Sequence, residues 1–144
     1  MKFETIRVLM IEDSMGDGQY IRAIIKEEEW VDIQLDQAFR LSSGIEKLKN
    51  GRYDVILLDL TLPDSCGINT LTTLLSEIKD TPVVIMTGLD DEEIGMKAVQ
   101  IGAQDFLIKL QIDGRTLVRS ILYAMARKNA VKAENHQTEK QGRT

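Results

Sequence analysis

The chain has little of the chemistry on which many hydrolases and metalloenzymes rely. Its 144 residues include one cysteine, Cys66, and one histidine, His136. A single cysteine cannot form an internal disulfide, which indicates a reducing compartment. His136 lies in a polar segment near the C-terminus. We therefore expect neither catalysis by a histidine base nor a histidine-rich metal site in this chain.

Long hydrophobic runs are also missing. No apolar stretch approaches the roughly 18 residues that span a bilayer, and the N-terminal MKFETIRVLM lacks the apolar segment of a signal peptide. The net charge of -5 argues against direct binding to nucleic acid, which needs a clustered basic surface. With 43% apolar and 28% charged residues, the composition is that of a globular protein. We expect a cytoplasmic protein that binds neither membranes nor nucleic acid.

Short apolar runs alternate with amphipathic segments along the chain. Three runs are nearly all apolar, as in strands buried on both faces of a parallel sheet, and they lie at 5–11, 54–60 and 82–87. Segment 31–39 alternates apolar and polar residues, which is typical of an edge strand with one face exposed. Segment 103–109 is predicted to be a fifth strand.

Helical periodicity fills the segments between and after these strands. The five expected helices centre on Ile21, Ile45, Leu74, Ala98 and Ile121. Asp113 is a suitable N-cap for the last one. Strict alternation of strand and helix predicts an α/β, flavodoxin-like doubly wound (βα)5 fold, with a parallel sheet of order 2-1-3-4-5 and helices on both faces. We expect one domain over 1–130 and a polar, disordered tail over 131–144.

Polar side chains stand where four of the predicted strands end. These are the pair Glu12-Asp13, then Asp59, Thr87 and Lys109. Each has an ordinary explanation alone, such as a helix cap for Asp13 or a solvated surface lysine for Lys109. Ligands bind outside the carboxyl ends of strands in open parallel sheets. Because four strands deliver polar groups to this same edge, we predict one shared site.

The expected charges of this site indicate a divalent cation. Three neighbouring carboxylates repel one another, and Lys109 supplies only one positive charge. Oxygen ligands without histidine or cysteine favour Mg²⁺, with Mn²⁺ as a substitute. Mg²⁺ usually binds one or two carboxylates, so a third carboxylate is left to react. An aspartate carboxylate is a competent nucleophile toward phosphorus, which predicts an aspartyl-phosphate.

This arrangement resembles the CheY-like receiver domain of two-component response regulators. The resemblance covers about residues 5–128. It rests on the acid pair Glu12-Asp13, on LLDLTLPDSCG around Asp59, on MTG with Thr87, and on GAQDFLIK with Phe106 and Lys109. The combination and its spacing are highly specific, whereas any one of these pieces alone would be weak.

The resemblance implies a role for each matching residue. Asp59 would be the phosphoacceptor, and Lys109 would contact the phosphoryl group. Thr87 would bind a phosphoryl oxygen, and Phe106 would be the switch aromatic that turns inward as Thr87 shifts. The Mg²⁺ ligands would be Glu12, Asp13, Asp59 and the backbone carbonyl of Thr61.

The resemblance also implies the partners. The phosphodonor would be a sensor histidine kinase or a histidine phosphotransfer protein, and an unknown downstream effector would bind the surface formed by residues 90–127. The chain would be a monomer or a phosphorylation-dependent dimer. It would catalyse no separate reaction, but would assist its own phosphorylation and dephosphorylation.

Two positions depart from the family pattern. Leu110 follows the lysine where the family usually has proline, and a cis bond is very costly before a residue other than proline. We therefore expect a trans peptide or local strain there. Phe106 replaces the commoner tyrosine, so it can pack inward but has no hydroxyl to donate.

Other functions account for fewer of these residues. A pseudo-receiver, which binds partners without phosphorylation, would lack Asp59, Lys109 or the acid pair, and all are present. A haloacid-dehalogenase-like phosphatase needs a second aspartate where Thr61 stands. There is no Gly-rich P-loop with Lys-Ser/Thr, and the acidic EDSMGDG is unsuited to binding a flavin phosphate directly.

Overall fold

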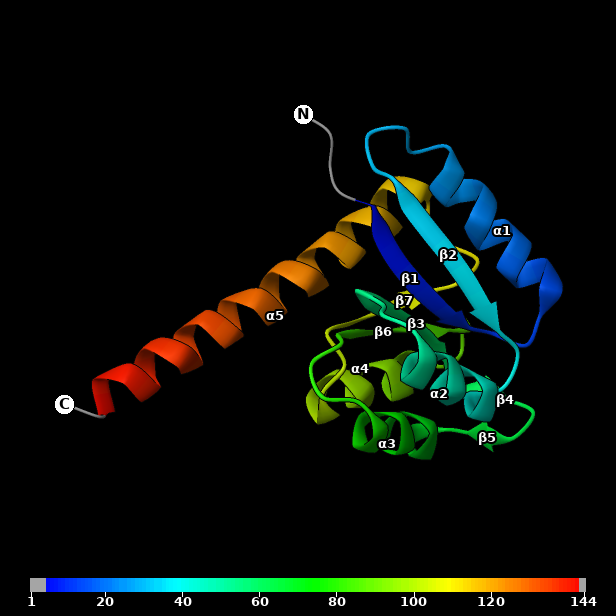
Figure 1. Cartoon of the computed structure of the whole chain (residues 1–144). Helices are drawn as coiled ribbons and strands as arrows, with labels where there is room; N and C mark the ends of the chain where they lie inside the picture. Colours follow the sequence, from blue (N-terminus) through cyan, green and yellow to red (C-terminus); the bar gives the residue numbers. More distant parts are fainter. Residues whose placement is uncertain (1–4, 143–144) are drawn as a thin grey trace.

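A computed structural model of the chain describes the backbone of residues 5–142 and the side chains of residues 5–128. Five parallel strands form its main sheet in the order β2-β1-β3-β6-β7 (Figure 1). They are β1 (Ile6–Ile11), β2 (Ile33–Ala38), β3 (Val55–Asp59), β6 (Val83–Thr87) and β7 (Asp105–Ile108). Taken in chain order, this arrangement is the predicted 2-1-3-4-5.

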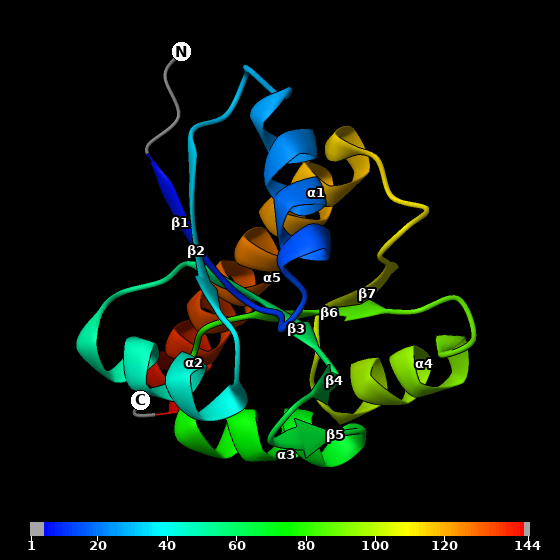
Figure 2. The same cartoon turned by 90° about the vertical axis from the view of Figure 1, so that its right-hand side faces the viewer.

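Helices cover both faces of the sheet. They are α1 (Met15–Lys26), α2 (Leu41–Asn50), α3 (Ile68–Glu77), α4 (Glu92–Ile101) and α5 (Gly114–Gly142). Figure 2 shows α1 and α5 on one face and α2, α3 and α4 on the other. This three-layer arrangement confirms the predicted flavodoxin-like fold.

Alternate residues of the central strands supply two separate cores. Leu9 and Ile11 of β1 pack under α2, α3 and α4, whereas Val8 and Met10 pack against α1 and α5. This explains why the central strands read as continuous apolar runs, since both of their faces are buried. The edge strand β2 is only partly buried along most of its length, as its alternating pattern predicted.

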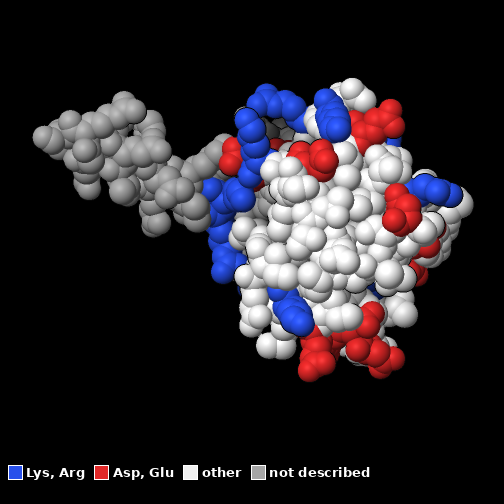
Figure 3. Space-filling model, turned by 90° about the horizontal axis from the view of Figure 1, so that it is seen from below, with Lys and Arg blue, Asp and Glu red and all other residues white. Residues whose placement is uncertain are grey.

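A small antiparallel ribbon follows β3 and was not predicted. Its strands are β4 (Thr61–Leu62) and β5 (Ser65–Cys66), joined by a two-residue turn. The following helix, α3, carries no charged residue before Glu77. Seen from below, the molecule accordingly presents a broad uncharged area with acidic and basic side chains around it (Figure 3).

The C-terminal segment differs from expectation. The sequence predicted disorder over 131–144, but α5 continues as one helix to Gly142. Lysine, glutamate and glutamine occur twice each in this segment and favour helix without any apolar periodicity. Residues 143–144 lie outside the described part of the chain. Within residues 5–142, no helix combines the length and apolar character required to cross a membrane.

Candidate functional site

Three carboxylates meet at the carboxyl edge of the sheet. Glu12 and Asp13 directly follow β1, and Asp59 is the last residue of β3, its neighbour. One ligand oxygen from each lies within 4.8 Å of the others. Glu12 and Asp59 are buried, whereas Asp13 is exposed. The structure thus brings the three predicted acids together at one edge of the sheet.

Lys109 reaches this cluster from the residue after β7. Its Nζ donates to Glu12 Oε2 at 2.7 Å, to Asp59 Oδ2 at 3.0 Å and to Asp17 Oδ2 at 3.0 Å. An ammonium group has three N–H donors, so each is occupied. The backbone N–H of Lys109 also donates to the Thr87 carbonyl at 2.9 Å.

The residue after the lysine does not prevent this geometry. No peptide bond among the described residues is cis, so the bond between Lys109 and Leu110 is trans, as expected for a residue other than proline. The lysine is instead held by its backbone bond to β6 and by its three carboxylate partners.

Burial and charge perturb two of these groups. Desolvation raises the pKa of Glu12 to about 7, although the hydrogen bond from Lys109 opposes this shift. For Lys109, burial alone would lower the pKa, but hydrogen bonds to Glu12 and Asp17 outweigh it and raise the pKa. The lysine therefore stays charged, and the cluster retains excess negative charge that a cation can neutralise.

The loop that carries the acid pair is fixed by hydrogen bonds. Ser14 is the N-cap of α1, with its Oγ accepting from Asp17 N at 3.1 Å, so Asp13 is not needed as the cap. The backbone N–H of Ser14 donates to Glu12 Oε1 at 3.0 Å. Gln37 Nε2, from β2, donates to the Glu12 carbonyl at 2.8 Å.

Close packing holds Gln37 in this position. A Cβ on Gly18 of α1 would lie 2.7 Å from Gln37 Nε2, which is too close for a real contact. Glycine at this point of α1 therefore leaves room for the Gln37 amide to reach the loop.

The segment after Asp59 is also ordered locally. Thr61 N donates to Asp59 Oδ1 at 2.9 Å, which leaves the aspartate between this N–H and Lys109. Asp64, in the turn of the ribbon, accepts from Leu41 N at 2.9 Å and from Ser42 N at 3.0 Å. It thereby satisfies two of the free N–H groups at the start of α2.

Thr87 ends β6, which pairs with β3, and Phe106 lies on β7, the next strand. Thr87, at the end of β6, is buried, and its hydroxyl donates to the Leu107 carbonyl at 3.3 Å. Phe106 is partly buried and packs against the core under α4. A Cβ on Gly95 of α4 would lie 2.5 Å from Phe106 Cδ2, so the ring lies directly against the helix backbone.

Asp17 is the site residue that sequence reasoning missed. It lies in the first turn of α1, four residues after Asp13. Its acidic character and its distance of about one helical turn from the acid pair are the signals that could have identified it. Its partner Lys109 lies 92 residues away, and no local pattern predicts that pairing.

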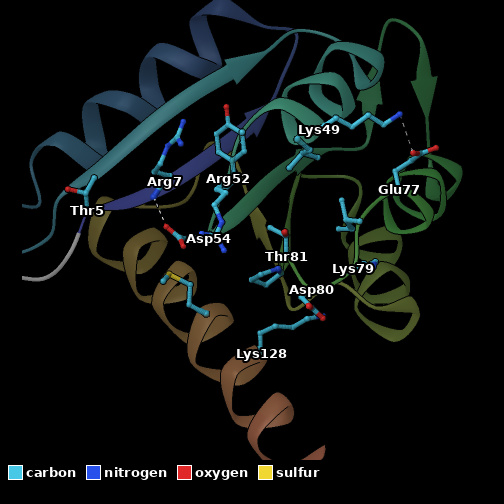
Figure 4. A pocket seen from close by; sticks show the side chains of 16 residues that line it. Thr5, Arg7, Lys49, Arg52, Asp54, Glu77, Lys79, Asp80, Thr81 and Lys128 are labelled. Carbon is cyan, nitrogen blue, oxygen red and sulfur yellow. Dashed lines mark hydrogen bonds and ion pairs between the residues drawn. The ribbon is translucent and has the colours of Figure 1, made fainter. Parts of the chain in front are cut away.

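A hollow of about 830 Å³ lies at the opposite, amino edge of the sheet (Figure 4). Several of its charged side chains bind neighbouring backbone or side-chain groups. Asp54 accepts from Arg7 N at 2.8 Å, and Lys49 pairs with Glu77 at 3.7 Å. Helices α2 and α3 both end here, and cations are favourable at helix C-termini. We therefore assign the candidate site to the carboxyl edge.

Comparisons with known proteins agree with this geometry. A family model described as the response regulator receiver domain matches residues 8–122. The cell cycle response regulator CtrA of Brucella ovis is 38% identical over 105 residues, which cover 72% of this chain and 44% of that protein. The same values hold for CtrA of Brucella abortus strain S19. The chain thus spans less than half the length of these curated relatives.

Solved structures share the fold over most of the chain. The Francisella response regulator 1452 receiver domain is 26% identical with a TM-score of 0.71, covering 85% of this chain and 98% of that one. The beryllofluoride-activated NtrC4 receiver domain dimer is 28% identical with the same TM-score and coverage. A Clostridium thermocellum receiver domain, 22% identical over 88% of this chain and 98% of its own, has a TM-score of 0.75 and supports the fold alone.

The family match, the relatives and the sheet order agree with one another, and the chain belongs to the response regulator receiver domain family, the CheY-like signalling domains of two-component systems.

Proposed function

We propose that this domain accepts a phosphoryl group on Asp59 with Mg²⁺ bound, and that phosphorylation switches the 90–127 surface for a downstream effector. The observation that carries the proposal is the cluster of three carboxylates within 4.8 Å, two of which, Glu12 and Asp59, also bond the half-buried Lys109. The donor is a phosphohistidine on a sensor kinase or phosphotransfer protein, encountered in the cytoplasm.

Phosphoryl transfer suits this set of side chains. An oxygen of ionised Asp59 forms a bond to phosphorus as the bond between phosphorus and the donor's imidazole nitrogen breaks, and that nitrogen keeps the electron pair. The carboxylate needs no general base to attack. Lys109 stabilises the charge of the transferring group. A chain whose only histidine is His136 can therefore carry out its part of the reaction.

The donor atoms suit Mg²⁺, with Mn²⁺ as a substitute. Glu12, Asp13 and Asp59 offer carboxylate oxygens, and the Thr61 backbone carbonyl is the fourth ligand that we propose. All are hard oxygen donors, without the nitrogen or sulfur that zinc prefers. When bound, the ion supplies positive charge for carboxylate and phosphoryl oxygens. Lys109 supplies the other positive charge in the cluster.

The proposed switch runs through Thr87 and Phe106. The Thr87 hydroxyl donates one long hydrogen bond, 3.3 Å, to the Leu107 carbonyl. Exchanging this bond for one to a phosphoryl oxygen therefore costs little free energy. Phe106 immediately precedes Leu107 on β7 and contacts α4. A shift of Thr87 can thus change the population of Phe106 positions and the surface of α4.

Exposed apolar side chains support the choice of partner surface. Met96 and Val99 on α4 and Tyr123 on α5 are exposed at 59%, 39% and 59%. Such groups are suitable anchors for a protein partner, or for a second copy in a phosphorylation-dependent dimer. If substitutions at these residues left every phosphorylation-dependent contact unchanged, this assignment would be wrong.

Incubation with acetyl phosphate and Mg²⁺ tests the function. We expect mass spectrometry to find one phosphoryl group on Asp59, slowly lost by hydrolysis, and none on the Asp59→Asn variant. The same assay with purified kinases of the source organism identifies the donor. A wild-type protein that stays unmodified in both assays would favour a pseudo-receiver.

A further inference from the structure

We propose that Asp17 is a positioning residue that competes with the phosphoryl group for Lys109. In the unphosphorylated protein it occupies one donor of the lysine, and it releases that donor when a phosphoryl group arrives on Asp59. The contact between Asp17 and Lys109 is a feature of the structure and does not depend on the proposed function. The role of Asp17 as a competitor does rest on the proposed function.

The argument begins with the donors of Lys109. Its three N–H groups are matched by three carboxylate oxygens at 2.7, 3.0 and 3.0 Å, from Glu12, Asp17 and Asp59. No donor remains for a fourth acceptor. A phosphoryl oxygen can be bound by this lysine only if one existing hydrogen bond is exchanged.

Exposure identifies which bond is exchanged. The side chain of Glu12 is 0% exposed and that of Asp59 is 8% exposed, whereas that of Asp17 is 36% exposed. Losing the lysine would leave the fully buried Glu12 carboxyl without this hydrogen-bond donor, which costs free energy. Water can replace the lysine at Asp17, because exposed ion pairs contribute little free energy.

The position of Asp17 adds a second effect in the same direction. Its carboxylate lies in the first turn of α1, where the helix N-terminus favours negative charge, and Lys109 is its partner among the side chains of residues 5–128. The negative charge of Asp17 therefore lies in contact with Lys109, the side chain that must bind the phosphoryl oxygens. Like charge at this point opposes the arrival of a phosphoryl group.

Asp17→Asn tests whether Asp17 holds Lys109 away from the phosphoryl group. The amide is isosteric but neutral, so it holds Lys109 less tightly and repels the phosphoryl group less. At saturating Mg²⁺ we expect phosphorylation by acetyl phosphate to become about threefold to fivefold faster, the range expected for an exposed ion pair. In this reaction a bond from phosphorus to Asp59 forms as the bond to acetate breaks, and acetate leaves.

A first measurement needs neither Mg²⁺ nor a phosphodonor. NMR of the lysine ammonium groups reports how firmly the Lys109 protons are held, through their exchange with water. We expect Asp17→Asn to accelerate this exchange several-fold and Asp17→Glu to restore much of the protection. Glu46→Gln, at an exposed acid of α2 outside the site and the 90–127 surface, is the matched control and should change nothing. Unchanged exchange in Asp17→Asn would overturn the proposal.

The second measurement compares phosphorylation rates of the same four proteins. A faster reaction in Asp17→Asn than in Glu46→Gln, with Asp17→Glu near the wild type, supports competition for Lys109. Equal rates in Asp17→Asn and Glu46→Gln would refute it, since only general charge would then matter. If the wild type itself stays unmodified, the proposed function fails, and the ammonium exchange still decides whether Asp17 holds the lysine.

Discussion

Replacing Gly95 with alanine tests how Phe106 is seated on α4. The new Cβ would lie 2.5 Å from Phe106 Cδ2, 2.7 Å from Cγ and 3.2 Å from Cβ. Distances this short cannot persist, so the ring or the helix must move. Gly95 has no positive φ, and alanine therefore introduces no backbone strain of its own.

Two opposing free energies set the expected result. Alanine is about 1 kcal/mol better than glycine inside a helix. Overpacking a well-filled core costs about 1–3 kcal/mol. The net change in wild-type protein is therefore a loss of stability of up to about 2 kcal/mol, or a lowering of Tm by several degrees at about 2–4 °C per kcal/mol.

Removing the aromatic ring should reverse the sign. In a Phe106→Ala background the two closest atoms, Cδ2 and Cγ, are absent, and only the 3.2 Å contact with Cβ opposes the gain in helix propensity. Gly95→Ala should then stabilise the protein by up to about 1 kcal/mol. Urea denaturation of the four proteins in this cycle gives the coupling free energy directly, which we expect to be about 1–3 kcal/mol.

A coupling near zero would refute the reasoning. So would a stabilising effect of Gly95→Ala of equal size in both backgrounds. Either result would mean that the ring does not lie against the backbone of α4, and that the proposed route from Phe106 to this helix needs another contact.

Three further substitutions test the site and its surroundings. Asp13→Ala should weaken Mg²⁺ binding at least about tenfold while leaving the urea midpoint unchanged or higher, as calorimetric titration and denaturation will measure; an unchanged affinity would mean that this carboxylate is not a ligand. Gly18→Ala should displace Gln37 from the acid loop and cost about 1 kcal/mol, whereas an increase in stability would show that the amide is not held there. Burial and a hydrogen bond to Asp36 raise the pKa of Tyr53 from 10.0 to about 12, so its contribution to stability should be lost as pH rises through that range. Asp36→Asn should lower this pKa, as phenolate absorbance will measure, and an unmoved titration would contradict the assigned cause.

Much of the fold was predictable because burial leaves a direct trace in the sequence. Strands covered on both faces must be nearly all apolar, as β1, β3 and β6 are, and a half-exposed edge strand must alternate. The same logic located the acids and the lysine, since a charged residue directly after such a run lies at the edge of the sheet. The cluster of Glu12, Asp13 and Asp59 with Lys109 followed from that rule and the family resemblance.

The features that were not predicted depend on contacts or on propensity without periodicity. The ribbon of β4 and β5 has two residues in each strand, too few for any repeat. Asp17 meets Lys109 through side chains far apart in the chain. The end of α5 continues without apolar periodicity in its sequence, so a prediction from periodicity ends this helix too early.

The length of α5 gives the domain a mechanical property that its compact part lacks. The helix has 29 residues, which at about 1.5 Å per residue gives a rod about 43 Å long. It begins five residues after Lys109, beside α1, where Gly114 fits closely against the Ile24 carbonyl. A tilt of about 5° at that end would displace the far end by roughly 4 Å. The rod extends beyond the compact part of the domain (Figure 1). A small movement near the site therefore becomes, at the far end of α5, a displacement as large as a side chain.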